Sequence, residues 1–395
     1  MTDGMISAPQ PEAVEAGIEV LKAGGNLIDA TVCAALVQTA VDPQMCGIAG
    51  FGNIQIFLPE KGVHTTFDFH GRAPKAVKSD IWESLIEREA EDGWGFILSG
   101  RENEFGYGSI STPRTLATLD TILNLYGTRS LKELIQPAIE YCRNGVLIRP
   151  HMSSYWNMPA TAGRDPNISM VNKFKETQKI YCDESGLVKK VGDLLLNPDM
   201  GQLYQDIGNY GVNHFYSGEI SQRIILDMQE NGGLLAIEDL QECTPEEHPP
   251  LWGTFFDYKI ATNNPPGGGV MLVEMLNILE EFDLKGMGHN SVEYIKVVSE
   301  VMKIATIDKD TKVGDPKFTV VPTDQLTSKS YAKAHAEKIK RGDRAVVNRV
   351  NKGNPESKCT TQLVLADVSG NCVTMTHTLG QPSGGVTEGL GVMYN

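Results

Sequence analysis

A chain of 395 residues is long enough to bury a large core, as one large domain or two moderate ones. Its hydrophobic content of 41% and charged content of 22% are ordinary for a globular protein, and no run of ~18 apolar residues predicts a membrane span. The net charge of −15, from 50 acidic and 35 basic residues, argues against nucleic acid or an anionic membrane as a partner.

The spacing of cysteines and histidines argues against a disulfide-rich or metal-binding protein. The seven cysteines are widely spaced, odd in number and form no CxxC pair, which favours free thiols in a reducing compartment over a disulfide framework. The eight histidines form no HxH or HxxxH cluster, so we expect no metal and no cofactor. The first residues lack a basic stretch followed by an apolar one, so we expect a cytoplasmic protein.

The N-terminal segment predicts two helices. Val14, Ile18 and Leu21 lie at i, i+4 and i+7, which is typical of an amphipathic helix over residues 11–23. Two glycines end that helix, and Asn26 can cap the next one. Residues 27–40 are small, apolar and rich in alanine, so they predict a buried helix.

A glycine-rich bend follows at residues 46–53. The runs 53–58 and 63–69 come next, are joined by a short turn, and predict a β-hairpin. A dinucleotide-binding fold needs a helix directly after its glycines, but here a strand follows Gly47, Gly50 and Gly52. The glycine spacing is therefore weak evidence for nucleotide binding.

Residues 79–247 are predicted to be mostly helical with polar loops, most clearly at 112–127, 130–145 and 221–233. A loop at 263–269 precedes predicted helices at 270–282 and 292–307. Residues 328–354 are polar and partly basic, so they predict a helix that runs into an exposed linker rather than an anion site.

The C-terminal segment predicts a second β-hairpin. Apolar residues alternate over 361–367, a turn follows at 368–371, and a return strand covers 372–378. Strands near both ends with helices between them predict an α+β fold, in which sequence-distant strands share one sheet with helices outside it.

Thr360 stands where the exposed linker meets this hairpin, and two interpretations compete. Threonine is common in strands for its shape alone. Alternatively, cleavage of the peptide bond between Cys359 and Thr360 would free an α-amino group, whose pKa of ~8 suits a base that activates the hydroxyl of the same residue. Thr378, on the return strand, could hydrogen-bond that hydroxyl. The local pattern alone leaves both interpretations open.

An ordered series of blocks resembles the gamma-glutamyltransferase family of N-terminal-nucleophile hydrolases. The similarity runs from about residue 5 to residue 395 and favours the nucleophile interpretation of Thr360. The blocks are MISAPQPEAVEAGIEVLKAGGNLIDATVCAALVQTAVDPQMCGIAGFG, DFHGRAPKAV, LYGTRSLKELIQPAIEYCRNGV, NPPGGGVMLVEMLNILEEFDL, KVGDPKF and CTTQLVLADVSGNCVTMTHTLGQPSGGVTEGLGVMYN.

The resemblance implies the αββα sandwich of these hydrolases and a self-processing enzyme. Residues 1–359 would form the large-subunit region and residues 360–395 the start of the small-subunit region, from one precursor and intertwined in one domain. Thr360 would be the nucleophile for both self-cleavage and turnover, with Thr378 supporting it. The substrate would be a small-molecule γ-glutamyl amide such as glutathione, whose acyl group passes to water or an amine.

Three features differ from the family pattern. His70 stands where the family has an arginine that holds the glutamyl α-carboxylate, so His70 and Arg72, two residues apart on one strand face, are the predicted substrate-binding residues. Gln362 replaces a histidine of the processing motif, and Gly380 replaces a substrate-contacting asparagine. The sequence ends at Asn395, so we expect an incomplete sandwich that lacks the family's later strands, serine pair and oxyanion-hole glycines.

Two alternatives remain open at this stage. One is an acylase of the same mechanism that acts on a side-chain amide other than γ-glutamyl, which the histidine at position 70 favours. The other is a degenerate family member that keeps the fold without the chemistry. The sequence leaves open whether the two subunits assemble into a larger oligomer.

Overall fold

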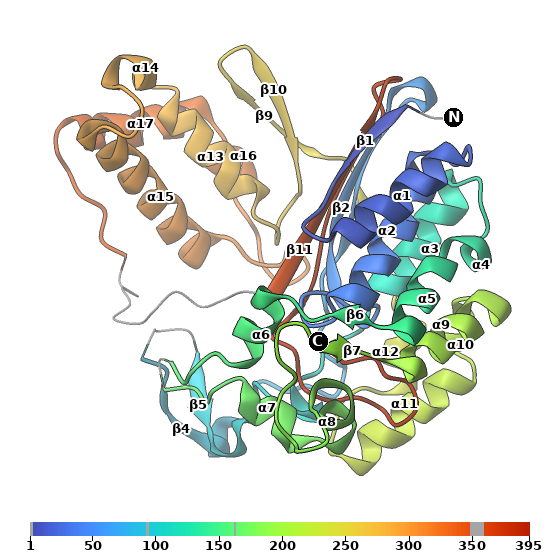
Figure 1. Cartoon of the computed structure of the whole chain (residues 1–395). Coiled ribbons are helices and arrows are strands. Elements are labelled where there is room, and N and C mark those ends of the chain that lie inside the picture. The colour runs from blue at the N-terminus through green and yellow to red at the C-terminus, as the bar shows by residue number, and fades with distance from the viewer. Residues whose placement is uncertain (1–2, 92–94, 162, 348–358) are drawn as a thin grey trace. The chain divides into compact units, whose positions relative to one another are not determined.

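A computed structural model describes residues 3–91, 95–161, 163–347 and 359–395 (Figure 1). The chain forms two compact units. Unit 1 comprises Met1–Val63, Phe67–Glu246 and Asn351–Asn395, and unit 2 comprises His64–Thr66 and Glu247–Val350. Both ends of the chain therefore contribute to unit 1.

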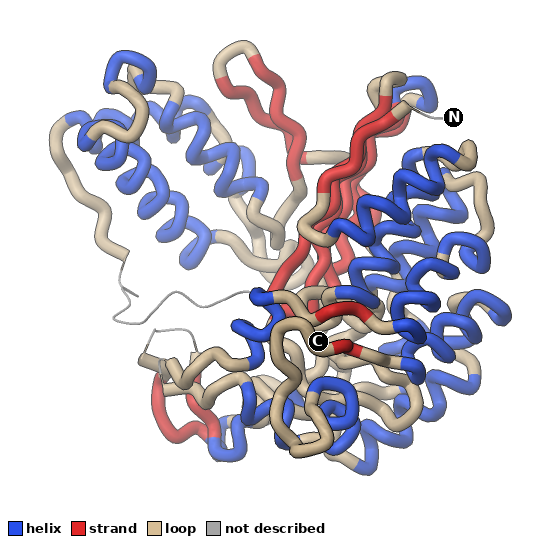
Figure 2. The backbone as a smooth tube through the Cα atoms, in the orientation of Figure 1, coloured by secondary structure: helices blue, strands red, loops and turns tan. Residues whose placement is uncertain are grey.

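The largest sheet has six strands in the order β1-β11-β12-β2-β3-β8. The strands β1, β11, β12 and β2 form three successive antiparallel pairs, so the C-terminal hairpin lies between two N-terminal strands. Figure 2 shows the long strands of this sheet, in red, running side by side. Both predicted hairpins are confirmed as β2–β3 and β11–β12. The bounds are β1 Gly4–Ser7, β2 Phe51–Leu58, β3 Val63–Phe69, β8 Glu246–His248, β11 Cys359–Asp367 and β12 Cys372–Gly380.

Two helices, α1 (Pro11–Lys22) and α2 (Leu27–Val41), lie beside this sheet, and α2 packs against β11 and β12. Asn26 caps α2 as predicted: its side chain accepts from the Asp29 N–H at 3.0 Å, and the Asp29 carboxylate accepts from the Asn26 N–H at 2.8 Å. Every residue of α2 is buried. The prediction of a buried Ala-rich helix is therefore confirmed.

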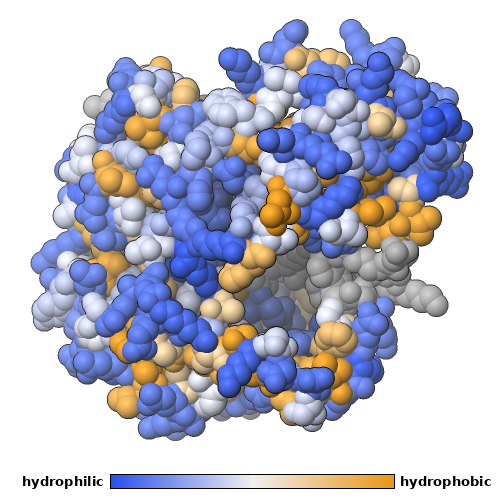
Figure 3. Space-filling view, turned by 180° about the vertical axis from the view of Figure 1, so that it is seen from behind, coloured by the Kyte–Doolittle hydropathy of each residue, from blue (hydrophilic) through white to orange (hydrophobic). Residues whose placement is uncertain are grey.

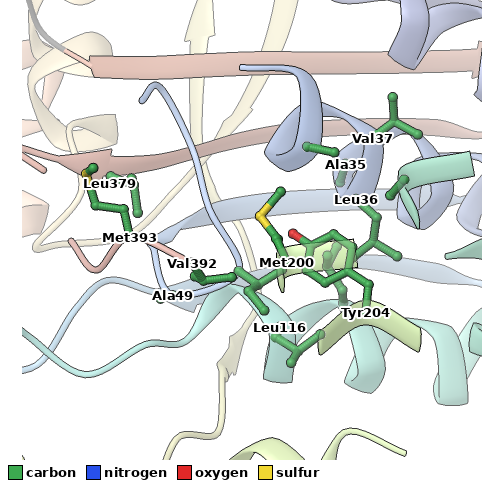
Figure 4. Packing of buried hydrophobic residues seen from close by; sticks show 14 of the residues in the cluster. Ala35, Leu36, Val37, Ala49, Leu116, Met200, Tyr204, Leu379, Val392 and Met393 are labelled. Carbon is green, nitrogen blue, oxygen red and sulfur yellow. The ribbon is translucent and has the colours of Figure 1, made fainter. Parts of the chain in front are cut away.

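The remaining helices of unit 1 complete its core. Figure 4 shows Leu36 of α2, Leu116 of α3, and Met200 and Tyr204 of α9 close together in it. The bounds are α3 Thr115–Tyr126, α4 Leu131–Leu134, α5 Gln136–Asn144, α6 Pro150–Trp156, α7 Ile168–Lys173, α8 Lys175–Tyr181, α9 Pro198–Tyr210, α10 Asn213–Tyr216, α11 Glu219–Glu230 and α12 Ile237–Gln241.

The middle of the chain differs from the prediction in two respects. The helix predicted at 130–145 is divided into α4 and α5, because Pro137 has no N–H to bond the carbonyl of Glu133 and its ring crowds that carbonyl. Two small two-stranded sheets were not predicted, since their strands are too short to show an alternating pattern: β4 (Ile86–Glu89) with β5 (Phe96–Leu98), and β6 (Val146–Leu147) with β7 (Leu194–Leu195).

Unit 2 combines a hairpin, β9 (Leu251–Phe255) and β10 (Tyr258–Thr262), with a group of helices. The helices predicted at 270–282 and 292–307 are confirmed as α13 and α15, and α15 runs one turn further. Residues 348–354 of the predicted linker lie outside the described residues. The helices are α13 Gly269–Leu279, α14 Leu284–Met287, α15 Val292–Lys312, α16 Thr323–Leu326 and α17 Lys329–Lys340.

Among the helices described, none is both long enough and apolar enough to cross a membrane. The face of the molecule drawn in Figure 3 is mostly hydrophilic, with scattered apolar residues.

Candidate active site

The β11–β12 hairpin brings Thr360 and Thr378 together. The register pairs Thr361 with His377 and then slips, so that Thr360 faces two residues of β12, Thr378 and Leu379. Such a β-bulge bends a strand locally and re-aims its side chains. The Thr360 hydroxyl donates to Thr378 Oγ1 across 3.2 Å. The structure thus places the two predicted catalytic residues in contact.

The position of Thr378 is fixed by its own backbone. The Gly380 N–H donates to Thr378 Oγ1 at 2.8 Å. Gly380 has a φ of +68°, and a Cβ there would lie 2.9 Å from the Phe51 ring. Glycine is therefore the residue that fits this turn without strain. A larger side chain at position 380 would disturb the contact that orients the Thr378 hydroxyl.

The glycine-rich bend serves the same hairpin. A Cβ on Gly50 would lie 2.2 Å from the carbonyl oxygen of Thr378, and a Cβ on Gly52 would lie 2.1 Å from that of Thr376. These glycines permit close approach of β2 to β12. Their spacing thus has a packing explanation that needs no nucleotide.

A cavity of about 350 Å³ opens beside the two threonines. Its volume is within the range of small-molecule sites. Thr360 and Thr378 line it together with Gly380 and Gln381. The other lining residues are apolar, polar or charged side chains of unit 1: Phe51, Glu104, Phe105, Met158, Pro159, Thr161, Arg164, Asp165 and Asn167.

Charged side chains form a network in the cavity wall. Arg101 pairs with Glu104, and both side chains are largely buried. Arg164 Nε lies 3.6 Å from Glu104 Oε1, and Arg101 Nη1 lies 3.8 Å from Asp165 Oδ1. A guanidinium in the wall can bind a substrate carboxylate, and a carboxylate there can bind an ammonium group. Sequence reasoning missed these residues, because they come from loops far from Thr360 and carry no motif.

His70 and Arg72 follow the end of β3 at Phe69, so they do not share a strand face as predicted, and each is held by another partner. His70 Nδ1 lies 2.9 Å from Asp68 Oδ1. Burial alone would raise the pKa of Asp68, but the hydrogen bond and charge of His70 hold that pKa below its ordinary value. Arg72 forms an ion pair with Glu246. The described residues that line the cavity include neither His70 nor Arg72, although the Phe51 ring lies 6.5 Å from the His70 ring.

A buried polar network lies behind the bulge. The Gln38 side chain of α2 donates to Thr361 Oγ1 at 3.0 Å and to Gln10 Oε1 at 2.7 Å. His377 Nε2 lies 2.9 Å from Gln38 Oε1. Burial lowers the pKa of His377 to about 3, so its ring is neutral at pH 7 and Nε2 carries the proton that the amide oxygen accepts. The available sequence signal was a glutamine in a helix of mostly apolar residues.

The predicted cleavage site is described only on its C-terminal side. The backbone of Cys359 begins β11, while residues 348–358 and the Cys359 side chain lie outside the described part of the chain. The six cysteine side chains that the structure describes are free thiols, and five of them are buried. Within the described ranges no cluster of three or more His, Cys, Asp or Glu side chains could hold a metal ion.

Comparisons with known proteins identify the family of this chain. The family model of gamma-glutamyltranspeptidase matches residues 13–395. A glutathione hydrolase proenzyme from Escherichia coli (strain K12) is 30% identical over 398 residues, which cover 99% of this chain and 66% of the relative. The acylase ACY 1 proenzyme from Pseudomonas sp. (strain V22) is 31% identical over 396 residues, which cover 99% of this chain and 68% of the relative. The chain thus spans about two thirds of the length of these relatives.

A solved structure gives the same result for the fold. The crystal structure of the Helicobacter pylori gamma-glutamyltranspeptidase superposes with a TM-score of 0.77 at 29% sequence identity. The match covers 88% of this chain and 94% of that one. The mixed α/β fold therefore has its structural neighbours among these hydrolases.

Proposed function

The chain belongs to the gamma-glutamyltranspeptidase family, and from that membership we propose that it is part of a self-processing amide hydrolase or acyltransferase with Thr360 as its nucleophile. The observation that carries the proposal is the contact between the Thr360 and Thr378 hydroxyls at the edge of a substrate-sized cavity. Acyl transfer by a hydroxyl needs a held nucleophile, space for a substrate and an adjacent base, and the α-amino group freed by cleavage before Thr360 would supply that base.

Self-cleavage would use the same hydroxyl as turnover. Thr360 Oγ1 attacks the carbonyl carbon of Cys359, and the peptide C–N bond breaks as an ester forms. Water then hydrolyses the ester, which releases the Cys359 carboxylate and leaves a free α-amino group on Thr360. In turnover that amine accepts the hydroxyl proton as Thr360 Oγ1 attacks the substrate amide carbon. The substrate C–N bond breaks, the leaving amine departs with the proton, and the acyl group stays on Oγ1 as an ester that water or an acceptor amine then cleaves.

We propose a γ-glutamyl amide such as glutathione as the substrate class, supported by the relative named glutathione hydrolase. His70 and Arg72 remain the proposed substrate-binding residues. For Arg72 to hold a carboxylate, its ion pair with Glu246 must open or be shared. Arg164 already lines the cavity and is a further candidate for the same role.

A second candidate function is an acylase of the same mechanism on another side-chain amide. The acylase relative at 31% identity and the histidine at position 70 favour it. Matched anilides separate the two candidates. A γ-glutamyl anilide carries an ammonium and a carboxylate, a glutaryl anilide carries only the carboxylate, and a butyryl anilide carries neither.

The finer fold assignment is also a proposal. In the αββα sandwich, a second sheet would cover the face of the six-stranded sheet that points away from α2. Support comes from Phe57 and Val364, apolar side chains in β2 and β11 that are 37% and 40% exposed, and from exposed Gln362. Residues 1–359 and 360–395 would then belong to the large and small subunits. The cytoplasmic location remains a prediction from the sequence.

Mass spectrometry of the purified protein tests the proposed function. We expect two fragments that meet between Cys359 and Thr360, and we expect only the uncleaved chain for Thr360→Ala. Thr374→Ala, which changes an exposed threonine on β12, is the matched control and should still cleave. An uncleaved wild-type protein, or a Thr360→Ala protein that cleaves normally, would remove the mechanism and favour the degenerate alternative.

A further inference from the structure

Gln38 is an unusual residue for its position. It lies near the end of α2, a helix in which every residue is buried, and its neighbours Leu36 and Val37 belong to the apolar core of Figure 4. Burial of an amide group is unfavourable unless its hydrogen bonds are replaced. The buried threonines of α2, Thr31 and Thr39, bond to carbonyls of their own helix, but Gln38 reaches outward to the sheet.

The contacts of Gln38 join two strands. Its amide nitrogen donates to Thr361 Oγ1 at 3.0 Å and lies 3.3 Å from the carbonyl oxygen of Gln362, both on β11. Its amide oxygen accepts from His377 Nε2 on β12 at 2.9 Å. One side chain from the helix layer therefore holds both strands of the hairpin.

These contacts involve one particular residue pair of the β11–β12 hairpin, which we call the rung: Thr361 and His377. Thr361 and His377 form the last regular pair before the bulge, and the reactive pair is one residue beyond it on each strand. The position of Thr360 relative to Thr378 thus depends on how firmly this rung is held. The paired residues Thr361 and His377, and Gln38 that bonds them both, are each at most 3% exposed.

A second glutamine fixes the orientation of the Gln38 amide. Gln10 Oε1 accepts from Gln38 Nε2 at 2.7 Å and from the Thr361 hydroxyl at 3.1 Å. Gln10 Nε2 donates to Asp42 Oδ2 at 2.7 Å. Because a carboxylate only accepts, the Gln10 amide has one orientation, and the Gln38 amide follows from it. His377 Nδ1 has no hydrogen-bond partner among the described residues, but the other hydrogen bonds of this network join α2 to both strands, and such buried bonds rigidify the groups that they connect.

We propose that Gln38 is a positioning residue for the nucleophile: by holding Thr361 and His377 it sets the Thr360–Thr378 contact that self-cleavage and turnover use. The inference rests on the proposed function for its kinetic consequence. Gln38 itself does not touch the reacting atoms, and it acts through the two residues that precede the bulge.

The test compares Gln38→Leu with Thr39→Val in the intact protein. Thr39 is the next residue of α2, is also buried, and bonds Leu36 and Tyr204 instead of the hairpin. Both variants lose buried hydrogen bonds, so both are expected to lower the melting temperature. Only Gln38→Leu should slow self-cleavage and lower kcat on the γ-glutamyl or glutaryl anilide, by at least tenfold, with KM changed less than threefold.

Two further measurements distinguish a loss of nucleophile positioning from misfolding of Gln38→Leu. His377→Gln keeps an N–H donor that can reach the Gln38 amide, whereas His377→Leu does not, so His377→Gln should cleave at least five times faster than His377→Leu. In crystals of Gln38→Leu, the Thr360 and Thr378 hydroxyl oxygens should be further apart than hydrogen-bonding distance. This structural measurement requires no activity.

Wild-type rates for Gln38→Leu, equal slowing by Thr39→Val, equal rates for the two His377 variants, or an unchanged hydroxyl contact in the crystal would each overturn the inference. The proposed function fails separately. If Thr360→Ala still cleaves, the nucleophile is wrong whatever Gln38 does, and if only Thr360→Ala is inactive while Gln38→Leu is normal, the positioning role alone is wrong.

Discussion

Replacement of Thr378 by valine tests the centre of the site with the smallest change of shape. Valine has nearly the volume of threonine, so the packing of β12 is retained while the hydroxyl is lost. Two interactions disappear with it: the contact with the Thr360 hydroxyl at 3.2 Å, and the acceptor for the Gly380 N–H at 2.8 Å. The first affects the reaction and the second affects the conformation of the bulge.

The magnitudes follow from these two contacts. A typical hydrogen bond contributes ~1 kcal/mol to stability, and a buried donor left without a partner costs ~1–3 kcal/mol. We therefore expect the free energy of unfolding of Thr378→Val to fall by ~1–3 kcal/mol. A misplaced nucleophile that raises the activation barrier by ~1.4–2.8 kcal/mol reacts ~10–100-fold more slowly. We therefore expect self-cleavage of Thr378→Val to slow by that factor.

The assay follows the uncleaved chain by gel and mass spectrometry from the time of synthesis, with thermal unfolding measured on the same samples. Thr378→Ser retains the hydroxyl and should cleave within about threefold of the wild-type rate, which corresponds to a change of less than ~0.7 kcal/mol in the activation barrier. Thr374→Val removes an acceptor for the Gln362 side chain at 2.7 Å, four residues away on the same strand. A Thr378→Val protein that cleaves as fast as Thr374→Val would refute the reasoning.

Three further outcomes follow from the structure. Burial lowers the pKa of His377 to about 3 from 6.5, so its contribution to stability is complete above pH 6.5 and is lost as the pH falls toward 3. The free energy of unfolding should fall by up to ~1.4 kcal/mol per pH unit in that range. Denaturant unfolding at pH 7 and pH 5 should show this fall in the wild type but not in His377→Gln. Gly52→Ala would place a Cβ 2.1 Å from the Thr376 carbonyl oxygen, so we expect the free energy of unfolding to fall by ~1–3 kcal/mol or more and self-cleavage to slow. Melting temperature and gel analysis measure these effects, and wild-type values would show that β2 and β12 can separate freely. Arg164→Met should raise KM for the γ-glutamyl and glutaryl anilides at least tenfold but leave KM for the butyryl anilide within twofold, and an equal effect on all three would exclude carboxylate binding by Arg164.

The parts of the fold that the sequence predicted are those with local signals. Asn26 and the paired glycines before it defined the boundary between α1 and α2, and alternation with a short turn defined both hairpins. The contact between Thr360 and Thr378 followed from the hairpin, because a short turn fixes the register of its strands. Pro137 was a visible signal for the break between α4 and α5.

The parts that could not be predicted depend on distant partners. The strand expected to carry Arg72 ends at Phe69, and Glu246, 174 residues further along the chain, forms an ion pair with Arg72. Gln38 was visible as a polar residue in an apolar run, but its partner Thr361 is 323 residues away. The cavity wall around Glu104 and Arg164 is formed by loops, whose positions depend on tertiary packing rather than on periodicity.

The order of the strands has a consequence during synthesis. β11 and β12 lie between β1 and β2, so this hairpin occupies the middle of a sheet whose other four strands are translated before it. The apolar surface of α2 that packs against these strands remains uncovered on the ribosome until residue 380 has emerged. Nascent chains with such uncovered surface are prone to aggregate. We therefore expect the emerging polypeptide to depend on chaperones, and backbone scission to begin only after translation has passed the second hairpin.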